Sequence, residues 1–312
     1  MSHGRAAYRT RGLDGVLLID KDPGPTSHDV VAACRRILGE KRIGHLGTLD
    51  PIAGGLLPMA IGQATRLTRF FLMERKSYRG AMRLGYSTDT YDRAGKRVSD
   101  EASSFPSLEE IRRQARSYVG RIRLTIPPYS ARKVGGKKLY ELARQGEIVI
   151  TEPKLVDIYA LDIERFDNGL VEFFVDCSTG TYVRSVAHEL GMKLGCGAHL
   201  DSLRRLQVGE FSIDRAVTLD QLRAARDDGK EAPFLLPMSG LLSSFDSITL
   251  TSADVREITF GKDILRKLNS VPTSKYLKLM DPSGALLIAI GEMVDRHSII
   301  ITIHPAVVLI RP

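Results

Sequence analysis

The stretch Gly44-His45-Leu46-Gly47-Thr48-Leu49-Asp50-Pro51, continued by Ala53-Gly54-Gly55-Leu56-Leu57, is the most informative part of this 312-residue chain. It sets one carboxylate, that of Asp50, among glycines and apolar residues. A residue before proline favours extended or turn backbone, and glycines let a backbone approach a ligand closely. The pattern is typical either of an ordinary Asx-Pro turn or of a loop that presents a lone carboxylate as nucleophile, general base or electrostatic partner.

Short strands and helices are expected on both sides of this loop. Thr26-Ser27-His28-Asp29 has the pattern of a capping box that opens a helix, and Gly39 is a natural end for it. The apolar periodicity predicts strands at 15–20, 76–84 and 170–177, helices at 108–119 and 181–194, and a loop at 85–95. The stretch 229–244 is expected to be loop-like, and the tail beyond it to hold short β-rich runs at 277–279, 285–290 and 299–303. These segments lack the regular strand–helix–strand rhythm of a doubly wound sheet, which favours an α+β fold.

The composition indicates a globular protein with an anionic partner. Lys and Arg number 45 against 37 Asp and Glu, which gives a formal charge of +8 and a pI near 9.4. Residues 245–312 hold eight basic and seven acidic side chains, so +7 of the charge lies before them. Cys34, Cys177 and Cys196 form no metal or disulfide pattern, which fits a reducing cytoplasm. The polar N-terminus is no secretory signal, and no apolar run is long enough to span a membrane.

A basic segment in the middle of the chain is a candidate for nucleic-acid binding. Between 121 and 144 a single acid, Glu141, stands among these cations: Arg121, Arg123, Arg132, Lys133, Lys137, Lys138 and Arg144. Tyr129 and Tyr140 are interleaved with them. Cations for phosphates and aromatic rings for bases are the components of an RNA-binding loop, although a solvated charged face would show the same charges.

Four further side chains each allow a functional and a structural interpretation. Lys21 could contact a phosphate or remain a solvated lysine, and His45 is more typical of a structural histidine than of a metal ligand. Tyr78 could stack on a base or move a proton, or be a half-buried aromatic residue. Arg184 follows the turn Ser178-Thr179-Gly180, one turn into the expected helix, where it could hold a catalytic aspartate ionised and oriented or lie on the surface.

The motifs of several other functions are missing from the sequence. His188-Glu189 lacks the second histidine of a zinc-protease helix, and Gly136-Lys137 lacks the other residues of a phosphate-binding loop. Gly195-Cys196-Gly197 has no third glycine at dinucleotide spacing. Neither a metal nor a nucleotide cofactor is therefore indicated.

Taken together and in this order, the motifs resemble those of the bacterial TruB-type tRNA pseudouridine synthases. The resemblance covers the chain after Gly12 and rests on these pieces: Lys21, Gly24 and Thr26-Ser27; the Asp50 loop; Tyr78; Tyr129-Ser130-Ala131 with Lys133 and Gly136; Gly180-Thr181-Tyr182-Val183-Arg184; and 195–200 with 203–205. The one departure is Lys21-Asp22-Pro23-Gly24, where the family usually has Lys-Pro-x-Gly.

The resemblance implies a catalytic domain with a mixed, mainly antiparallel central sheet. It implies a flexible basic arm at 1–12, the catalytic domain at 13–240, an RNA-gripping insertion at 121–150 and a small β-rich, RNA-binding PUA-like domain at 245–312. The implied reaction is isomerisation of uridine 55 in the T-arm of tRNA, whose base is flipped out. No cofactor, metal or obligatory protein partner is implied, and a monomer is expected.

The family's functional residues map onto matching positions. Asp50 matches the essential aspartate, Tyr78 the residue that stacks on the uracil and can take the C5 proton, and Arg184 the partner of the aspartate. His45 matches the residue that fills the gap left by the flipped base. The remaining matches, all on the substrate side, are Asp92 and Arg144 in an Asp–Arg network, Lys21 and Leu203 in the pocket, and Tyr129, Arg132, Lys133 and Tyr182.

Two other functions remain open at this point. The basic segment and the β-rich tail also suit a non-catalytic RNA-binding or tRNA-folding protein, although binding alone would not need Asp50, Tyr78 and Arg184. The guide-RNA-dependent branch of the same superfamily is the other. Activity on a bare T-arm hairpin would distinguish a tRNA uridine-55 pseudouridine synthase from both alternatives.

Overall fold

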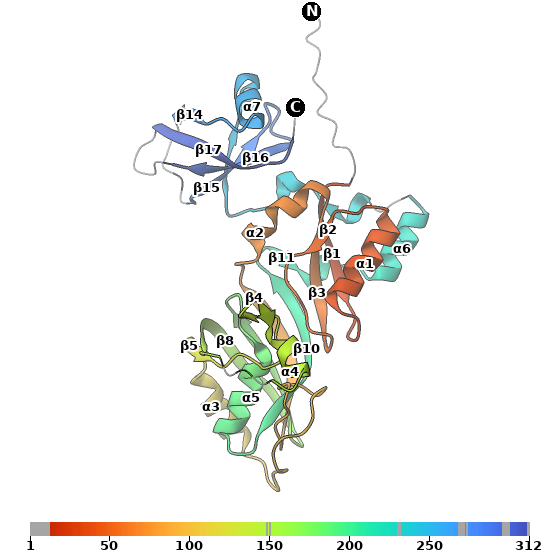
Figure 1. The fold of residues 1–312 in the computed structure, drawn as a ribbon, viewed down its shortest axis with the longest axis vertical. Helices are drawn as coiled ribbons and strands as arrows, with labels where there is room; N and C mark the ends of the chain where they lie inside the picture. Colours follow the sequence, from red (N-terminus) through yellow and green to blue (C-terminus); the bar gives the residue numbers. More distant parts are fainter. Residues whose placement is uncertain are drawn as a thin grey trace, which may run out of the picture.

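A computed structural model describes residues 13–147, 149, 151–229, 232–267, 272, 274–294 and 300–310. The expected arm at 1–12 lies outside the described residues. Figure 1 shows a large α/β part and, above it, a smaller β-rich part formed by the C-terminal segment. The described residues include no helix long and apolar enough to cross a bilayer.

A ten-stranded mixed sheet forms the centre of the large part. Its strands follow the order β12-β1-β3-β10-β4-β9-β8-β5, with β2 paired to β3 and β11 to β10. β3 and β10 run parallel, and the other ladders of this sheet are antiparallel within the described residues. The strands are β1 Gly15–Lys21, β2 Ile43–His45, β3 Ala53–Ile61, β4 Lys76–Leu84, β5 Gly120–Leu124, β8 Lys154–Asp167, β9 Leu170–Cys177, β10 Ala198–Val208, β11 Phe211–Ser212 and β12 Leu235–Leu236.

Helices cover this sheet, and a short hairpin lies beside it. The α-helices of the large part are α1 Ser27–Leu38, α2 Thr68–Phe71, α3 Leu108–Arg116, α4 Leu139–Arg144, α5 Val183–Lys193 and α6 Leu219–Asp227. The 3₁₀ turns are η1 Gly62–Leu67, η2 Ile213–Arg215, η3 Ala232–Phe234 and η4 Met238–Gly240, and the hairpin is β6 Lys133–Val134 with β7 Lys137–Lys138. The predicted capping box forms at Thr26 and Asp29, and Gly39 ends α1 with φ +66°.

The C-terminal segment forms a separate five-stranded sheet in the order β13-β15-β16-β17-β14. Its elements are β13 Asp246–Thr249, α7 Ser252–Thr259, β14 Ile264–Lys267, β15 Tyr276–Met280, β16 Leu287–Met293 and β17 Ile300–Val308. Leu277, Leu279, Ile301 and Ile303 build a small core of its own beneath α7. This arrangement is the small β-rich domain expected for the tail.

The central sheet is buried on both faces, and its second face is shared with the C-terminal sheet. Along β1, Leu17 and Ile19 enter the core beneath α1 and α5, whereas Val16 and Leu18 enter the other core. That second core also takes in Met280, Leu287, Ile290 and Val307 from the C-terminal sheet. The continuous apolar run of β1 follows from this double burial.

Helix α2 provides further contacts between the two parts. Arg66 and Arg69, from η1 and α2, donate hydrogen bonds to the carbonyls of Val308 and Ala306. Phe70 packs edge-on against Phe245 and Tyr276, with ring centroids 5.5 Å and 5.0 Å away. The C-terminal sheet is thus held by side chains as well as by the connecting chain.

Most predicted elements form, with shifted ends. The helix expected to 119 stops at Arg116, where turns closed by hydrogen bonds between residues three apart lead into Gly120 at φ +111°. The helix expected from 181 begins at Val183, because Tyr182 has extended backbone, so Arg184 lies in its first turn. The strand expected from Ala285 begins at Leu287, since the Asp281 carboxylate binds the N–H groups of Ala285 and Leu286.

Two predicted loops contain strands. The stretch 229–244, expected to be loop-like, includes β12, which pairs with β1. Arg121–Leu124, expected to open the RNA-gripping insertion, belong to β5 at the edge of the central sheet, where Arg121 pairs with Asp157.

Candidate active site

The Asp50 loop is held between β2, β3 and the start of α1. The Ser27 hydroxyl donates to the Leu49 carbonyl at 3.0 Å and accepts from the Leu49 N–H at 2.9 Å. Behind the aspartate, the Ala53 N–H donates to the Asp50 carbonyl at 3.0 Å. The backbone on both sides of Asp50 is therefore fixed, while its side chain stays 40% exposed.

Arg184 joins three segments at this aspartate. Its Nε lies 2.8 Å from Asp50 Oδ2 and its Nη1 3.5 Å from Asp92 Oδ2. Nη1 and Nη2 also donate to the carbonyls of Thr90 and Tyr129, at 2.9 Å and 3.1 Å. The contact with Asp50 is an ion pair rather than a well-aligned hydrogen bond, because Nε does not point along it.

This arrangement orients the single carboxylate of Asp50. The Arg184 side chain is 6% exposed and that of Asp92 9%, so the pair is shielded from solvent. A guanidinium carries its charge at any physiological pH and has a rigid fork of donors. It therefore keeps a charged partner beside Asp50 and leaves the other Asp50 oxygen open to a ligand.

Tyr78 lies on β4, buried and directly opposite Arg205 of β10. Burial raises the pKa of Tyr78 to about 12; the charges of Cys177 and Asp50 also raise it, while the charge and hydrogen bond of Arg205 lower it. The phenol is therefore neutral near pH 7. A buried aromatic ring near the Asp50 carboxylate suits stacking on a planar base.

Two lysines beside the loop are buried rather than solvated. Lys21 Nζ donates to the carbonyls of Ala53 and Asp22, at 2.6 Å and 3.0 Å, and burial is the main cause of its lowered pKa. Lys76 Nζ donates to the Glu74 carbonyl at 2.8 Å and to the Thr179 hydroxyl at 3.3 Å. Burial, and then the charge of Arg205, lower the pKa of Lys76 to about 8.

Replacing Lys76 by Met should stabilise the protein at neutral pH. The unfolded chain binds more protons than the folded one between pH 8 and 10.5, the folded and ordinary pKa values of Lys76. The penalty of burying this cation is thus complete below pH 8 and disappears as the pH rises to about 10.5. At pH 7 the gain in unfolding free energy should be of order 1–2 kcal/mol, after the lost hydrogen bonds are subtracted.

Thermal unfolding of Lys76→Met and of the unaltered protein at pH 7 and pH 10 measures this effect. We expect a higher melting temperature for the variant at pH 7 and a smaller difference at pH 10. An equal difference at both pH values would contradict the burial of a charged Lys76.

His45 is the last residue of β2 and leads into the Asp50 loop. Its Nδ1 accepts from the Gly47 N–H at 3.3 Å, and its ring meets that of His28 edge-on at 5.5 Å. Burial, the charge of His28 and the charge of Arg205 lower the pKa of His45. A neutral, half-buried imidazole at this position is compatible with filling a gap in a base stack.

The other predicted residues are placed at various distances from the cluster. Tyr182 caps α5 just before Arg184, and half-buried Leu203 lies on β10 opposite Gly80. Arg132 and Lys133 are exposed at the β6–β7 hairpin. Arg144 does not join the Asp–Arg network in the part of the chain that is described: it lies over the Tyr140 ring, 5.5 Å from the centroid.

Arg205 and Lys76 are two buried cations near the Asp50 loop that the sequence did not single out. Arg204 and Arg205 are adjacent, and only the strand register shows which one turns inward. Side chains alternate between the two faces of a strand, and Lys76, Tyr78 and Arg205 share one face of the sheet. This alternation along β4 and β10 was the sequence signal from which their burial could have been predicted. The described residues hold no cluster of three or more metal-ligating side chains.

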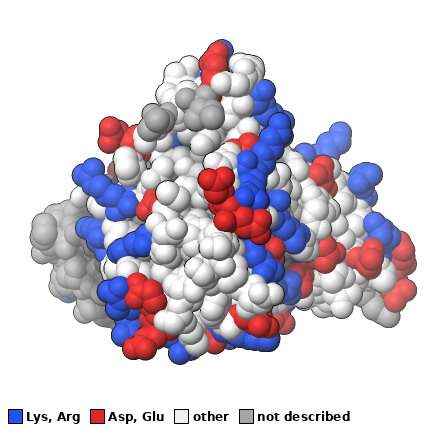
Figure 2. Space-filling view, turned by 90° about the horizontal axis from the view of Figure 1, so that it is seen from below, with Lys and Arg blue, Asp and Glu red and all other residues white. Residues whose placement is uncertain are grey.

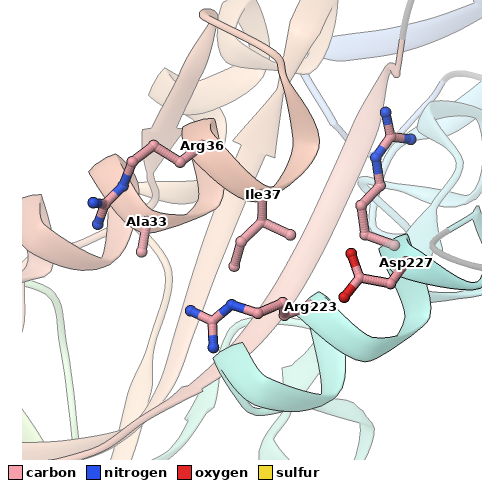
Figure 3. Close-up of a pocket in the computed structure, with 6 residues that line it drawn as sticks. Ala33, Arg36, Ile37, Arg223 and Asp227 are labelled. Atoms are coloured by element: carbon pink, nitrogen blue, oxygen red, sulfur yellow. The ribbon is translucent and has the colours of Figure 1, made fainter.

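A hollow of about 390 Å³ lies elsewhere, between α1 and α6. Figure 3 shows Ile37 and Asp227 facing this gap, with the Arg36 guanidinium at its rim. Arg223, which also lines it, is paired with Asp220 at 2.7 Å. None of the residues around Asp50 lines this hollow, so it is not the candidate active site.

Two family models cover most of the large part of the chain. The N-terminal domain of TruB family pseudouridylate synthases matches residues 35–183, and the C-terminal domain of tRNA pseudouridylate synthase B matches 184–243. A curated tRNA pseudouridine synthase B from Solibacter usitatus is 42% identical over 298 residues, 95% of this chain and 100% of that protein. The chain belongs to the TruB family of pseudouridylate synthases.

Other comparisons agree with the TruB assignment. The tRNA pseudouridine synthase B of Citrobacter koseri is 38% identical over 94% of this chain and 95% of its own. Among solved structures, a chain of an archaeal box H/ACA sRNP Nop10-Cbf5 complex has a TM-score of 0.71 at 25% identity, covering 96% of this chain and 87% of that one. A chain of an H/ACA RNP bound to a substrate RNA, at 22% identity, shares the fold with a TM-score of 0.72, over 99% of this chain and 94% of its own.

Proposed function

We propose that this TruB-family isomerase converts uridine 55 in the T-arm of tRNA to pseudouridine. The N1–C1′ bond breaks, a C5–C1′ bond forms, C5 loses a proton and N1 gains one. The observation that carries the proposal is the ion pair of Asp50 with the buried Arg184, itself held by Asp92. An isomerisation needs one carboxylate, whereas glycoside hydrolysis uses two at a defined separation.

The neighbouring residues suit the binding of a flipped uridine. In this proposal Tyr78 stacks on the uracil, His45 fills the space that the base leaves, and Asp50 acts at the ribose. In the same proposal, Lys21, Tyr182 and Leu203 line the uridine site. Extruding the base costs a few kcal/mol of stacking, which RNA contacts must offset.

The basic hairpin and the C-terminal sheet are our candidates for those contacts. Arg132, Lys133 and Lys137 are exposed around β6–β7, and Tyr129 connects this region to Arg184 through its carbonyl. Figure 2 shows lysines and arginines, interspersed with acidic side chains, around a broad uncharged area on one face of the molecule. We further propose that the C-terminal sheet is a PUA-like RNA-binding domain, which tighter binding of whole tRNA than of its T-arm hairpin would support.

A tritium-release assay tests the proposed function. The purified protein is incubated alone with a T-arm hairpin that carries 5-tritiated uridine at position 55, and a matched hairpin with cytidine at position 55 and tritiated uridines elsewhere serves as the control. We expect release from the first hairpin only. Binding without release would favour the non-catalytic RNA-binding function.

Activity of the protein alone also excludes the guide-RNA-dependent alternative. That alternative has one specific observation in its favour, the similarity to a chain from a Nop10-Cbf5 complex. Release that needs an added guide RNA or protein would support it. We propose that the enzyme acts as a monomer in the cytoplasm, where its three free cysteines would stay reduced.

A further inference from the structure

Arg205 is a fully buried guanidinium at the centre of the large sheet. It lies on β10, opposite Tyr78 of β4 and beside Gly55 of β3, and is 1% exposed. Burying a cation costs free energy unless its donors find acceptors. The identity of these acceptors shows what the residue holds in place.

The acceptors are backbone carbonyls on both sides of Asp50. Arg205 Nε donates to Leu56 O at 2.8 Å, Nη2 to Gly47 O at 2.9 Å and Nη1 to Thr48 O at 3.4 Å. Within the described ranges no carboxylate forms an ion pair with this side chain. Arg205 therefore ties the loop to the sheet and keeps its positive charge.

The Tyr78 hydroxyl faces that charge. Tyr78 and Arg205 are cross-strand partners, and each shifts the ionisation of the other through charge and a hydrogen bond. The other ionisable groups that act on Tyr78 are Cys177 and Asp50, and both oppose its ionisation. Arg205 is thus the group around Tyr78 that favours a negative oxygen.

We propose that Arg205 is a positioning residue for the proton step at C5, through Tyr78 and through the loop that carries Asp50. The inference rests on the proposed function. Tyr78 is neutral at the start of this step: as its oxygen takes the C5 proton, its own hydroxyl proton passes to solvent, and the C–H electron pair restores the ring double bond. Arg205 gains and loses no proton; it stabilises the negative charge that develops on the phenol oxygen and fixes the distance of Tyr78 from the loop.

Substitution of Arg205 should slow the proton step selectively. For Arg205→Met we expect kcat on the T-arm hairpin to fall about 100-fold, the lower end for a positioned proton-transfer group, with little change in KM. A 5-deuterated target uridine should give a larger isotope effect than in the unaltered protein. Arg205→Lys, which keeps a cation beside Tyr78, should recover part of kcat and show a smaller isotope effect.

The neighbouring arginine is the matched control. Arg204 is exposed and pairs with Asp20 at 2.7 Å, so Arg204→Met should change neither kcat nor the isotope effect. An unchanged kcat in Arg205→Met would overturn the proposal. A lower kcat with an unchanged isotope effect would also overturn it, because it would assign Arg205 a merely structural role.

A substrate-free measurement separates this inference from the proposed function. If the unaltered protein fails to isomerise the hairpin, the proposed function fails. Amide hydrogen exchange of residues 46–50 then still tests whether Arg205 ties the loop to the sheet: faster exchange in Arg205→Met than in Arg204→Met supports this role, and equal exchange overturns it. Melting temperatures of all variants confirm that each one is folded.

Discussion

Asp50→Asn should abolish pseudouridine formation while the protein still binds its RNA. The amide has the shape of the carboxylate but neither its charge nor its nucleophilicity, so we expect turnover to fall by about 10⁴-fold or more. Asp50 is half exposed, and Arg184 keeps Asp92 as a partner, so the fold should tolerate the change. Product formation from the T-arm hairpin is measured by tritium release.

The affinity for the hairpin is measured on the same preparation. A change of less than tenfold in Kd, under about 1.4 kcal/mol, would show that the loss concerns chemistry rather than binding. Asp167→Asn is the matched control, because this exposed carboxylate is also paired with an arginine, Arg165, at 3.1 Å. Normal turnover by Asp50→Asn would disprove the assignment of the active site.

Arg184→Lys should lower turnover about 10²- to 10³-fold, the range for loss of an oriented charged donor in a shielded site. A lysine keeps the charge, but its single nitrogen cannot reach Asp50, Asp92 and the carbonyls of Thr90 and Tyr129 together. The effect should fall on kcat, since the arginine contacts protein groups. Single-turnover assays at saturating hairpin measure it directly.

Lysine is the informative replacement because it leaves the buried Asp92 with a cation. Removing the charge would instead leave that carboxylate unpaired, at a cost of about 3–5 kcal/mol, and mix instability with catalysis. Arg165→Lys, in the surface pair with Asp167, serves as the control and should be silent. If Arg184→Lys turned over like the unaltered protein, the orienting role of this ion pair would be refuted.

The parts of the site that could be predicted are those that local chemistry specifies. Thr26 and Asp29 predict the helix that supports the loop, and the glycines around Asp50 predict the loop itself. The ends of elements were less predictable, because they depend on remote partners, as at Ala285 and Tyr182. The strand at the start of the expected insertion was missed for the same reason, because β5 forms by pairing with the distant β8.

The burial of certain lysines and arginines could not be predicted from the amino-acid composition around them. A lysine in a short polar stretch normally lies in solvent, yet Lys21 and Lys76 are buried against carbonyls. Which of Arg204 and Arg205 enters the core depends on register, and register depends on the whole sheet. Arg144 shows the converse, since a matching position in the chain did not bring its side chain to the expected network.

The core shared between the two sheets has a consequence for the unfolding of this protein. Val16, Leu18 and Leu56 from the large sheet pack in one cluster with Leu287 and Ile290 from the C-terminal sheet. Neither half can open without exposing apolar surface on the other, so the chain should behave as one cooperative unit. A shortened chain that lacks the C-terminal sheet would expose an apolar face of the large sheet and would be prone to aggregate.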